Sequence, residues 1–195
     1  MVRAFGLHPK GRGFEPLSAH QTHMALTYSQ TIPFGAPVPN FSLPGIDGKN
    51  YSLADFKGKK ALVIIFMCNH CPYVKACIDR LIALQNEFGP VGAQFVGINA
   101  NDDKDYPEDN FENMKKFAKE RGINFPYLRD ETQKTAKAYA AVCTPDIFVY
   151  DENLGLAYHG RIENNELAEA LKALLAGEKP PQDQKPSMGC SIKWK

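Results

Sequence analysis

The sequence has no long hydrophobic run and no marked excess of either charge. No stretch reaches the roughly 18 apolar residues that a membrane-spanning helix needs, and 23 basic against 22 acidic residues leave a formal net charge of +1. A balanced charge offers no electrostatic footprint for nucleic acid or for an anionic membrane. We therefore expect neither partner. No apolar segment of the kind found in secretion signals stands near the first residue, so we expect a soluble, cytoplasmic protein.

A second metal-binding motif is also missing. The chain has five cysteines, an odd number, and its only C-x-x-C is Cys68–Cys71. A structural zinc site usually needs another Cys or His pair, and no further C-x-x-C or H-x-x-x-H occurs. Because structural disulfides are rare in cytosolic chains, the motif favours a redox dithiol that works without metal or cofactor. Zinc and two unpaired buried thiols remain the alternatives.

The C-x-x-C stands where a buried strand gives way to a helix. Residues 61–67 are uncharged with a β-branched centre, which predicts a strand buried on both faces. Apolar residues then recur at three- and four-residue steps from Val74 to Phe88, which predicts an amphipathic helix. Pro72 has no N–H to donate, so it belongs in the first turn and places Cys68 at or just before the helix N-terminus. The helix dipole favours a thiolate there, so we expect Cys68 to be the attacking sulfur.

Length and composition predict one folded domain with two tails. A chain of 195 residues with 44% apolar and 23% charged residues is ordinary for a globular protein. We predict a flexible N-terminal arm at residues 1–35, the domain at 36–177 and a C-terminal tail at 178–195. The internal Met24 leaves open a later start, which would make residues 1–23 an extension. The three histidines of the arm are not expected to form a functional metal site.

Alternating residues and turn signals organise the domain. A β-hairpin is predicted around the turn at 44–49, and residues 93–100 form a second strand that completes a parallel strand–helix–strand unit. The acidic stretch 101–109 lacks the glycine and glutamate of an EF-hand, so we expect a solvated loop that caps the next helix. The remaining predicted elements are a helix ending near Gly122, an extended piece at 125–128, a helix at 132–139, strands at 146–150 and 156–161, and a helix at 165–176.

The C-terminal tail carries a cysteine, Cys190, close to the only tryptophan. Ile192 and Trp194 would gain from burial, so we expect the tail to dock on the domain. Cys190 is a candidate for a third redox thiol with a resolving or regulatory role. Cys77, by contrast, lies on the apolar face of the motif helix, where core packing explains it.

The strand, C-x-x-C and helix, followed later by Thr144-Pro145 just before an apolar strand, resemble the thioredoxin superfamily. The hairpin start and the longer middle segment are similar to its peroxiredoxin (AhpC/TSA) and TlpA/ResA-like branch. More narrowly, residues 66–74 together with the tail at 186–194 look like the bacterial "peroxiredoxin-like" thioredoxin-family proteins. The resemblance implies an α/β, thioredoxin-like fold, in which helices flank a central mixed sheet and a β-hairpin extends the N-terminal side.

The same resemblance implies a thiol–disulfide oxidoreductase. In that superfamily the proline that corresponds to Pro145 is cis, and its loop faces the dithiol and helps to hold the substrate's chain. Thr144 and Pro145, with Asn69 of the motif, are therefore candidate substrate contacts. The implied partners are a disulfide-containing protein or a small-molecule thiol or disulfide, together with a thiol electron donor.

The motif suggests how such a cycle would run. Cys68 would attack a substrate disulfide, and Cys71 would resolve the mixed disulfide. An imidazolium at His70 near the Cys68 sulfur would favour the thiolate and make the pair more oxidising; the alternative is a His70 that faces solvent. The strand at 61–67 contains no acid, whereas thioredoxin keeps a buried aspartate in its corresponding strand, so His70 or water would carry the proton.

Two other functions remain open. Peroxiredoxins attack peroxide with a cysteine in a Pro-x-x-x-Thr-x-x-Cys site, and Cys71-Pro72 can be laid on their Cys-Pro. That alignment puts Cys68 in place of the threonine and Ile64 in place of the proline, which weakens a peroxidase assignment. The other alternative is a redox-sensing or metal-carrying module that uses Cys68, His70 and Cys71.

Overall fold

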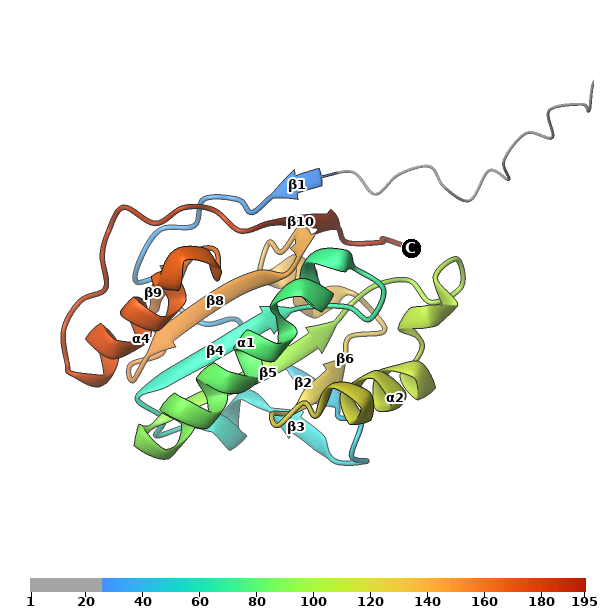
Figure 1. Ribbon diagram of the computed structural model, residues 1–195, viewed down its shortest axis with the longest axis horizontal. Coiled ribbons are helices and arrows are strands. Elements are labelled where there is room, and N and C mark those ends of the chain that lie inside the picture. The colour runs from blue at the N-terminus through green and yellow to red at the C-terminus, as the bar shows by residue number, and fades with distance from the viewer. Residues whose placement is uncertain (1–25) are drawn as a thin grey trace, which may run out of the picture.

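A five-stranded mixed sheet forms the centre of the molecule (Figure 1). The computed structural model describes residues 26–195, so the expectations for Met24 and for the three histidines of the arm lie outside the described residues. The strand order is β6–β5–β4–β8–β9. The bounds are β4 (Ala61–Phe66), β5 (Ala93–Asn99), β6 (Tyr127–Arg129), β8 (Asp146–Asp151) and β9 (Leu156–His159).

The central strand is β4, as its uncharged sequence predicted. All six of its residues are buried, because the sheet is covered on both faces. It pairs in parallel with β5 on one side and antiparallel with β8 on the other. β4, α1 (Pro72–Phe88) and β5 therefore form the predicted strand–helix–strand unit, and the mixed sheet is confirmed.

Helices cover the two faces of this sheet. Successive residues of a strand point to opposite faces, and in β4 Val63 and Ile65 pack with α1, α2 (Phe111–Arg121) and α4 (Glu166–Leu175). Ile64 and Phe66 pack on the other face with the N-terminal hairpin and with α3 (Lys134–Ala138). Within residues 26–195, no helix combines the length and the apolarity that crossing a membrane requires.

The predicted hairpin consists of β2 (Ser42–Pro44) and β3 (Asn50–Ser52). Its turn needs a glycine at Gly48, where φ is +82°. Short 3₁₀ turns at Leu53–Phe56, Gly89–Val91, Pro107–Asp109 and Glu163–Asn165 connect other elements.

A second sheet brings the two ends of the described chain together. β10 (Met188–Ser191) lies between β1 (Leu26–Tyr28) and β7 (Cys143–Thr144) and runs antiparallel to both. Figure 1 shows the dark red β10 beside the blue β1, above the start of α1. The C-terminal tail thus becomes a strand of the fold.

Both predicted tails can be compared with this sheet. Ile192 is 3% exposed, so the C-terminal tail docks as expected, although Trp194 remains 41% exposed. The structure differs from the predicted flexible arm at residues 26–35. There β1 pairs with β10, and the amide of Gly35 donates to the carbonyl of Leu156.

Candidate active site

The C-x-x-C motif lies between the end of β4 and the start of α1. Pro72 is the first residue of α1, and Cys71 is the N-cap. The sequence-based expectation put Cys68 at or just before the helix N-terminus, and it lies three residues before the N-cap. Pro72 occupies the very first helical position, where its missing N–H costs nothing, so Cys68 lies outside the helix.

The loop that carries Pro145 lies against both sulfurs. The Thr144–Pro145 peptide is cis, as the resemblance implied. The Cys68 sulfur lies 3.5 Å from the hydroxyl oxygen of Thr144, and the Cys71 sulfur lies 3.1 Å from the Thr144 carbonyl oxygen. One residue therefore contacts both cysteines, far from either in the sequence.

The two thiols differ in acidity, and the order is the reverse of the expected one. A hydrogen bond from the Cys68 thiol lowers the pKa of Cys71 to about 4, outweighing the effect of burial, and the Val74 amide at the helix N-terminus helps. Burial raises the pKa of Cys68 well above its usual value, and the negative charge of Asp109 adds to this. The lowered pKa of Cys71 and the raised pKa of Cys68 make Cys71 the more acidic thiol of the pair.

His70 is held by a buried carboxylate. Its Nδ1 lies 2.6 Å from Oδ2 of Asp109, and its ring stacks on Tyr106 with centroids 5.2 Å apart. The side chain is 14% exposed, so the solvent-facing alternative does not hold. Its Nε2 is buried and has no hydrogen-bond partner among the described residues. Asp109 thus orients the ring and leaves Nε2 available for chemistry.

Asp109 stays ionised although it is fully buried. Burial pushes its pKa upward, but hydrogen bonds from His70, from the Asn101 side chain and from the Asn69 amide more than offset this, and the net pKa is lowered. The hydrogen bonds from the Asn69 backbone amide and the Asn101 side-chain amide to this carboxylate are both 2.7 Å long. The negative charge of Asp109, which is far from the motif in the sequence, therefore lies close to the Cys68 sulfur.

Asn69 shapes the turn between the cysteines. Its side chain donates to the Glu108 carbonyl at 2.7 Å and accepts from the Tyr127 hydroxyl at 2.9 Å. It is 6% exposed. These contacts fix the side chain inside the site, and its role as a substrate contact stays a prediction.

The acidic stretch at 101–109 is part of the site, which the sequence did not reveal. Asn101, Asp102 and Asp109 are all buried, whereas a solvated loop was expected. The predicted helix cap does exist, but it is Asn110, whose side chain accepts from the Asn113 amide at 2.8 Å. One residue is enough to cap α2, so the sequence did hold a signal for the site: Asp109, next to the cap, is not needed for capping.

A second buried His–Asp pair follows Pro145. His159 Nε2 lies 2.8 Å from Oδ1 of Asp146, and burial raises the pKa of Asp146. Sequence reasoning correctly found no acid in β4, but it missed that Asp109 and Asp146 bring buried carboxylates from other elements.

Cys68, His70 and Asp109 could be considered as metal ligands. One ligand atom of each lies within 4.8 Å of the others. Both Asp109 oxygens, however, already accept hydrogen bonds, from the Asn69 amide on one side and from His70 and Asn101 on the other. The carboxylate therefore positions His70 and is not poised to bind an ion.

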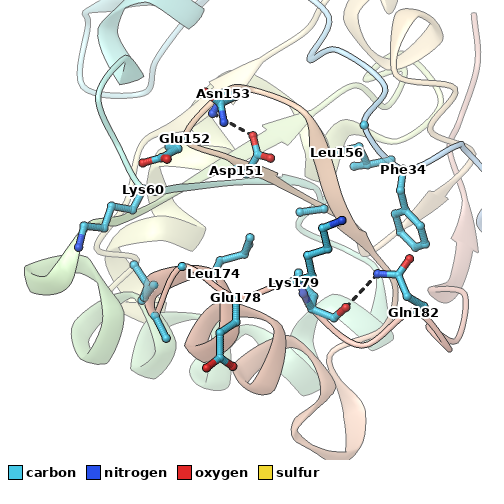
Figure 2. A pocket seen from close by; sticks show the side chains of 16 residues that line it. Phe34, Lys60, Asp151, Glu152, Asn153, Leu156, Leu174, Glu178, Lys179 and Gln182 are labelled. Carbon is cyan, nitrogen blue, oxygen red and sulfur yellow. Dashed lines mark hydrogen bonds between the residues drawn. The ribbon is translucent and has the colours of Figure 1, made fainter.

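A surface cavity lies far from these sulfurs. Figure 2 shows it lined by Lys60, Asp151 and Leu174 among others, with a volume of about 700 Å³. Asp151 pairs with Ala61 at the start of β4, whereas Cys68 follows its end, a separation of about 20 Å along a six-residue strand. The cavity and the cysteines occupy opposite ends of the sheet.

The geometry defines a dithiol at a helix N-terminus facing a cis-proline loop, on a thioredoxin-like fold. A thioredoxin domain of a thiol-disulfide oxidoreductase from Bacteroides vulgatus has the same fold, with a TM-score of 0.58 at 20% identity over 66% of this chain and 89% of that one. Residues 34–159 match the AhpC/TSA family, and the chain belongs to that family.

Relatives named for two activities resemble the chain. Thiol-disulfide oxidoreductase ResA of Geobacillus thermodenitrificans is 26% identical over 65% of this chain and 68% of its own length. Chloroplastic peroxiredoxin Q of Gentiana triflora is 28% identical over 72% of this chain and 65% of its own. A solved structure of an uncharacterized conserved protein from Geobacillus kaustophilus is 46% identical, with a TM-score of 0.86 over 88% of this chain and 97% of that one.

Proposed function

We propose that the protein is a thiol–disulfide oxidoreductase in which Cys68 and Cys71 cycle between dithiol and disulfide. The observation that carries this is the contact of both sulfurs with Thr144 of the cis-proline loop. The ResA relative supports it. The partners would be a protein or small-molecule disulfide and a thiol donor, and we place the protein in the cytoplasm.

Cys71 begins the reaction in this proposal. Its thiolate attacks one sulfur of a substrate disulfide and releases the other as a thiolate. Cys68 then loses its proton and attacks Cys71, which forms the Cys68–Cys71 disulfide and releases the second substrate sulfur. Cys68 becomes more acidic at that stage, because the hydrogen bond to anionic Cys71 that raised its pKa is gone.

The surrounding groups have roles in this cycle. A ring nitrogen of His70 and an Asp109 oxygen lie within 4.8 Å of the Cys68 sulfur, so this pair is the nearest acceptor for its proton. Thr144 and Pro145 would hold the substrate's chain. A thiolate as acidic as Cys71 stabilises the reduced form and makes the pair oxidising.

Mild oxidation followed by mass spectrometry tests the cycle. We expect a Cys68–Cys71 disulfide that dithiothreitol reverses, and loss of insulin-disulfide exchange in Cys71→Ser and Cys68→Ser. Cys77→Ser changes a buried thiol on the core side of α1 and serves as the control. Activity that survives Cys71→Ser would contradict the proposal.

A thiol peroxidase is the second candidate, because both sulfurs are almost fully buried and a peroxide is small. The Cys71 thiolate would attack a peroxide oxygen and release water or an alcohol. Cys68 would convert the resulting sulfenic acid to the disulfide with loss of water. The peroxiredoxin Q relative supports this. Peroxide consumption with a thiol recycling system, faster than insulin exchange, would favour it.

A further inference from the structure

Cys71 has two thiol neighbours. Interactions with the thiols of both Cys68 and Cys190 lower the pKa of Cys71. All three cysteines are buried, Cys190 at 2% exposed. A dithiol cycle needs only two sulfurs, so the third, supplied by the C-terminal tail, requires a separate explanation.

The tail strand brings Cys190 to this position by pairing with the cis-proline loop. Cys190 lies opposite Thr144 in the register of β10 and β7. The fit is close: a Cβ on Gly189 would overlap the Thr144 carbonyl oxygen. The same oxygen lies 3.1 Å from the Cys71 sulfur. The tail and the dithiol therefore meet at one backbone group.

Hydrogen bonds hold the strand on both sides of Cys190. Before it, the Ser187 hydroxyl donates to a backbone carbonyl at 2.8 Å. After it, the Lys193 amide donates to Oδ1 of Asn101 at 2.9 Å, and Asn101 also donates its side-chain amide to Asp109. The tail is tied into the polar network of the site.

We infer that Cys190 is a third redox thiol that takes over the disulfide from the C-x-x-C pair; this rests on the proposed cycle of Cys68 and Cys71. The Cys190 sulfur attacks Cys71 in the Cys68–Cys71 disulfide. A Cys71–Cys190 bond forms, the Cys68–Cys71 bond breaks, and the proton of Cys190 ends on Cys68. One disulfide replaces another, so no oxidant or reductant is consumed.

Charge favours this exchange only in the oxidised protein. In the reduced protein, burial and the Cys71 thiolate raise the pKa of Cys190 to about 12. A Cys71 in a disulfide carries no charge, so it no longer raises the pKa of Cys190. The charge of Lys193 lowers that pKa. Released Cys68 keeps the proton, because burial and Asp109 favour its neutral form.

Time-resolved disulfide mapping tests the exchange. The full-length protein is oxidised with one equivalent of diamide, quenched with acid, alkylated, digested without reduction and analysed by mass spectrometry. We expect Cys68–Cys71 to form first and Cys71–Cys190 to grow at its expense. In Cys190→Ser the first disulfide should persist, and in Cys68→Ser the Cys71–Cys190 bond should form directly.

A matched control is Cys143→Ser, which changes another buried thiol in β7 and should leave the pattern unchanged. A Cys68–Cys71 disulfide that persists, with no Cys71–Cys190 bond in wild type or in Cys68→Ser, would overturn the inference and leave the proposed function standing. Absence of Cys68–Cys71 from both wild type and Cys190→Ser would overturn both. The wild-type time course needs no substitution, so a misfolded variant cannot hide the result.

Discussion

Asp109 accepts a 2.6 Å hydrogen bond from His70 and thereby ties a distant acidic loop to the C-x-x-C motif. The carboxylate also accepts from the Asn101 side chain and from the Asn69 amide. Three segments of the site thus depend on one buried charge: the motif turn, the acidic loop and, through Asn101, the C-terminal tail.

Asp109→Asn should destabilise the protein by about 1–3 kcal/mol, because buried partners of the carboxylate lose a charged acceptor. It should also lower the pKa of Cys68, since the charge of Asp109 helps to raise it. Urea unfolding measures the first effect, and thiolate absorbance in a Cys71→Ser background measures the second. Asp105→Asn, at an exposed position of the same loop, is the control.

The stability effect of Asp109 should depend on pH. Its folded pKa is lowered, so its contribution is present above the ordinary carboxyl pKa near 3.8 and is lost as the pH falls below that. The difference in unfolding free energy between wild type and Asp109→Asn should therefore shrink as the pH falls toward 3. A difference that grows on acidification would contradict the assigned charge.

Cys71 should titrate as the acidic thiol. The thiolate absorbance near 240 nm should appear with a midpoint near pH 4 in wild type and vanish in Cys71→Ser. Cys68→Ala removes the hydrogen bond that lowers this pKa, so the midpoint should rise. The thiolate's contribution to stability is full above the ordinary thiol pKa and is lost as the pH falls through about 4. No thiolate signal below pH 7 would disprove the assignment.

Tyr127→Phe should cost about 0.5–1.5 kcal/mol, because the Asn69 side chain loses one hydrogen-bond partner in a buried position. The change removes only a hydroxyl, so the core volume is kept. Thermal or urea unfolding gives the magnitude. Tyr28→Phe, which alters an exposed tyrosine of β1, should fall within error of wild type.

Gly189→Ala should push β10 away from the cis-proline loop, since the added Cβ would overlap the Thr144 carbonyl oxygen. Displacement of the strand would uncover Cys71, so its alkylation rate at pH 7 should increase several-fold and the melting temperature should fall. Gly155→Ala is the matched control, because a Cβ there meets only ordinary contacts at 3.5 Å or more. Equal alkylation rates in the two variants would show that β10 does not cover the dithiol.

Local patterns predicted most of the fold correctly. The uncharged run of β4, the apolar spacing of α1 and the turn around Gly48 each reflect interactions within a few residues or a face buried as a whole. Such features can be predicted from the sequence because apolar residues recur with the period of the helix or strand that buries them. The order of the elements from β2 to α4 was predicted for the same reason, apart from the short β7, whereas β1 and β10 were not predicted.

The site was predicted only in part. The C-x-x-C and Thr144-Pro145 were visible as motifs, but Asp109 looked like a helix cap, since its role depends on a contact with His70 across 39 residues. The acidity of the two thiols was predicted in the wrong order, because it depends on which cysteine begins the helix and which is nearer to the buried carboxylate.

The sequence by itself determined that a C-x-x-C stands between a buried strand and a helix that Pro72 begins. Only the tertiary structure decided which sulfur is the thiolate and what surrounds it. Cys190 and Asp109 reach Cys71 and Cys68 through strand pairing and loop packing over long separations. Burial and hydrogen bonding then shift their pKa values, and neither effect exists until the chain has folded.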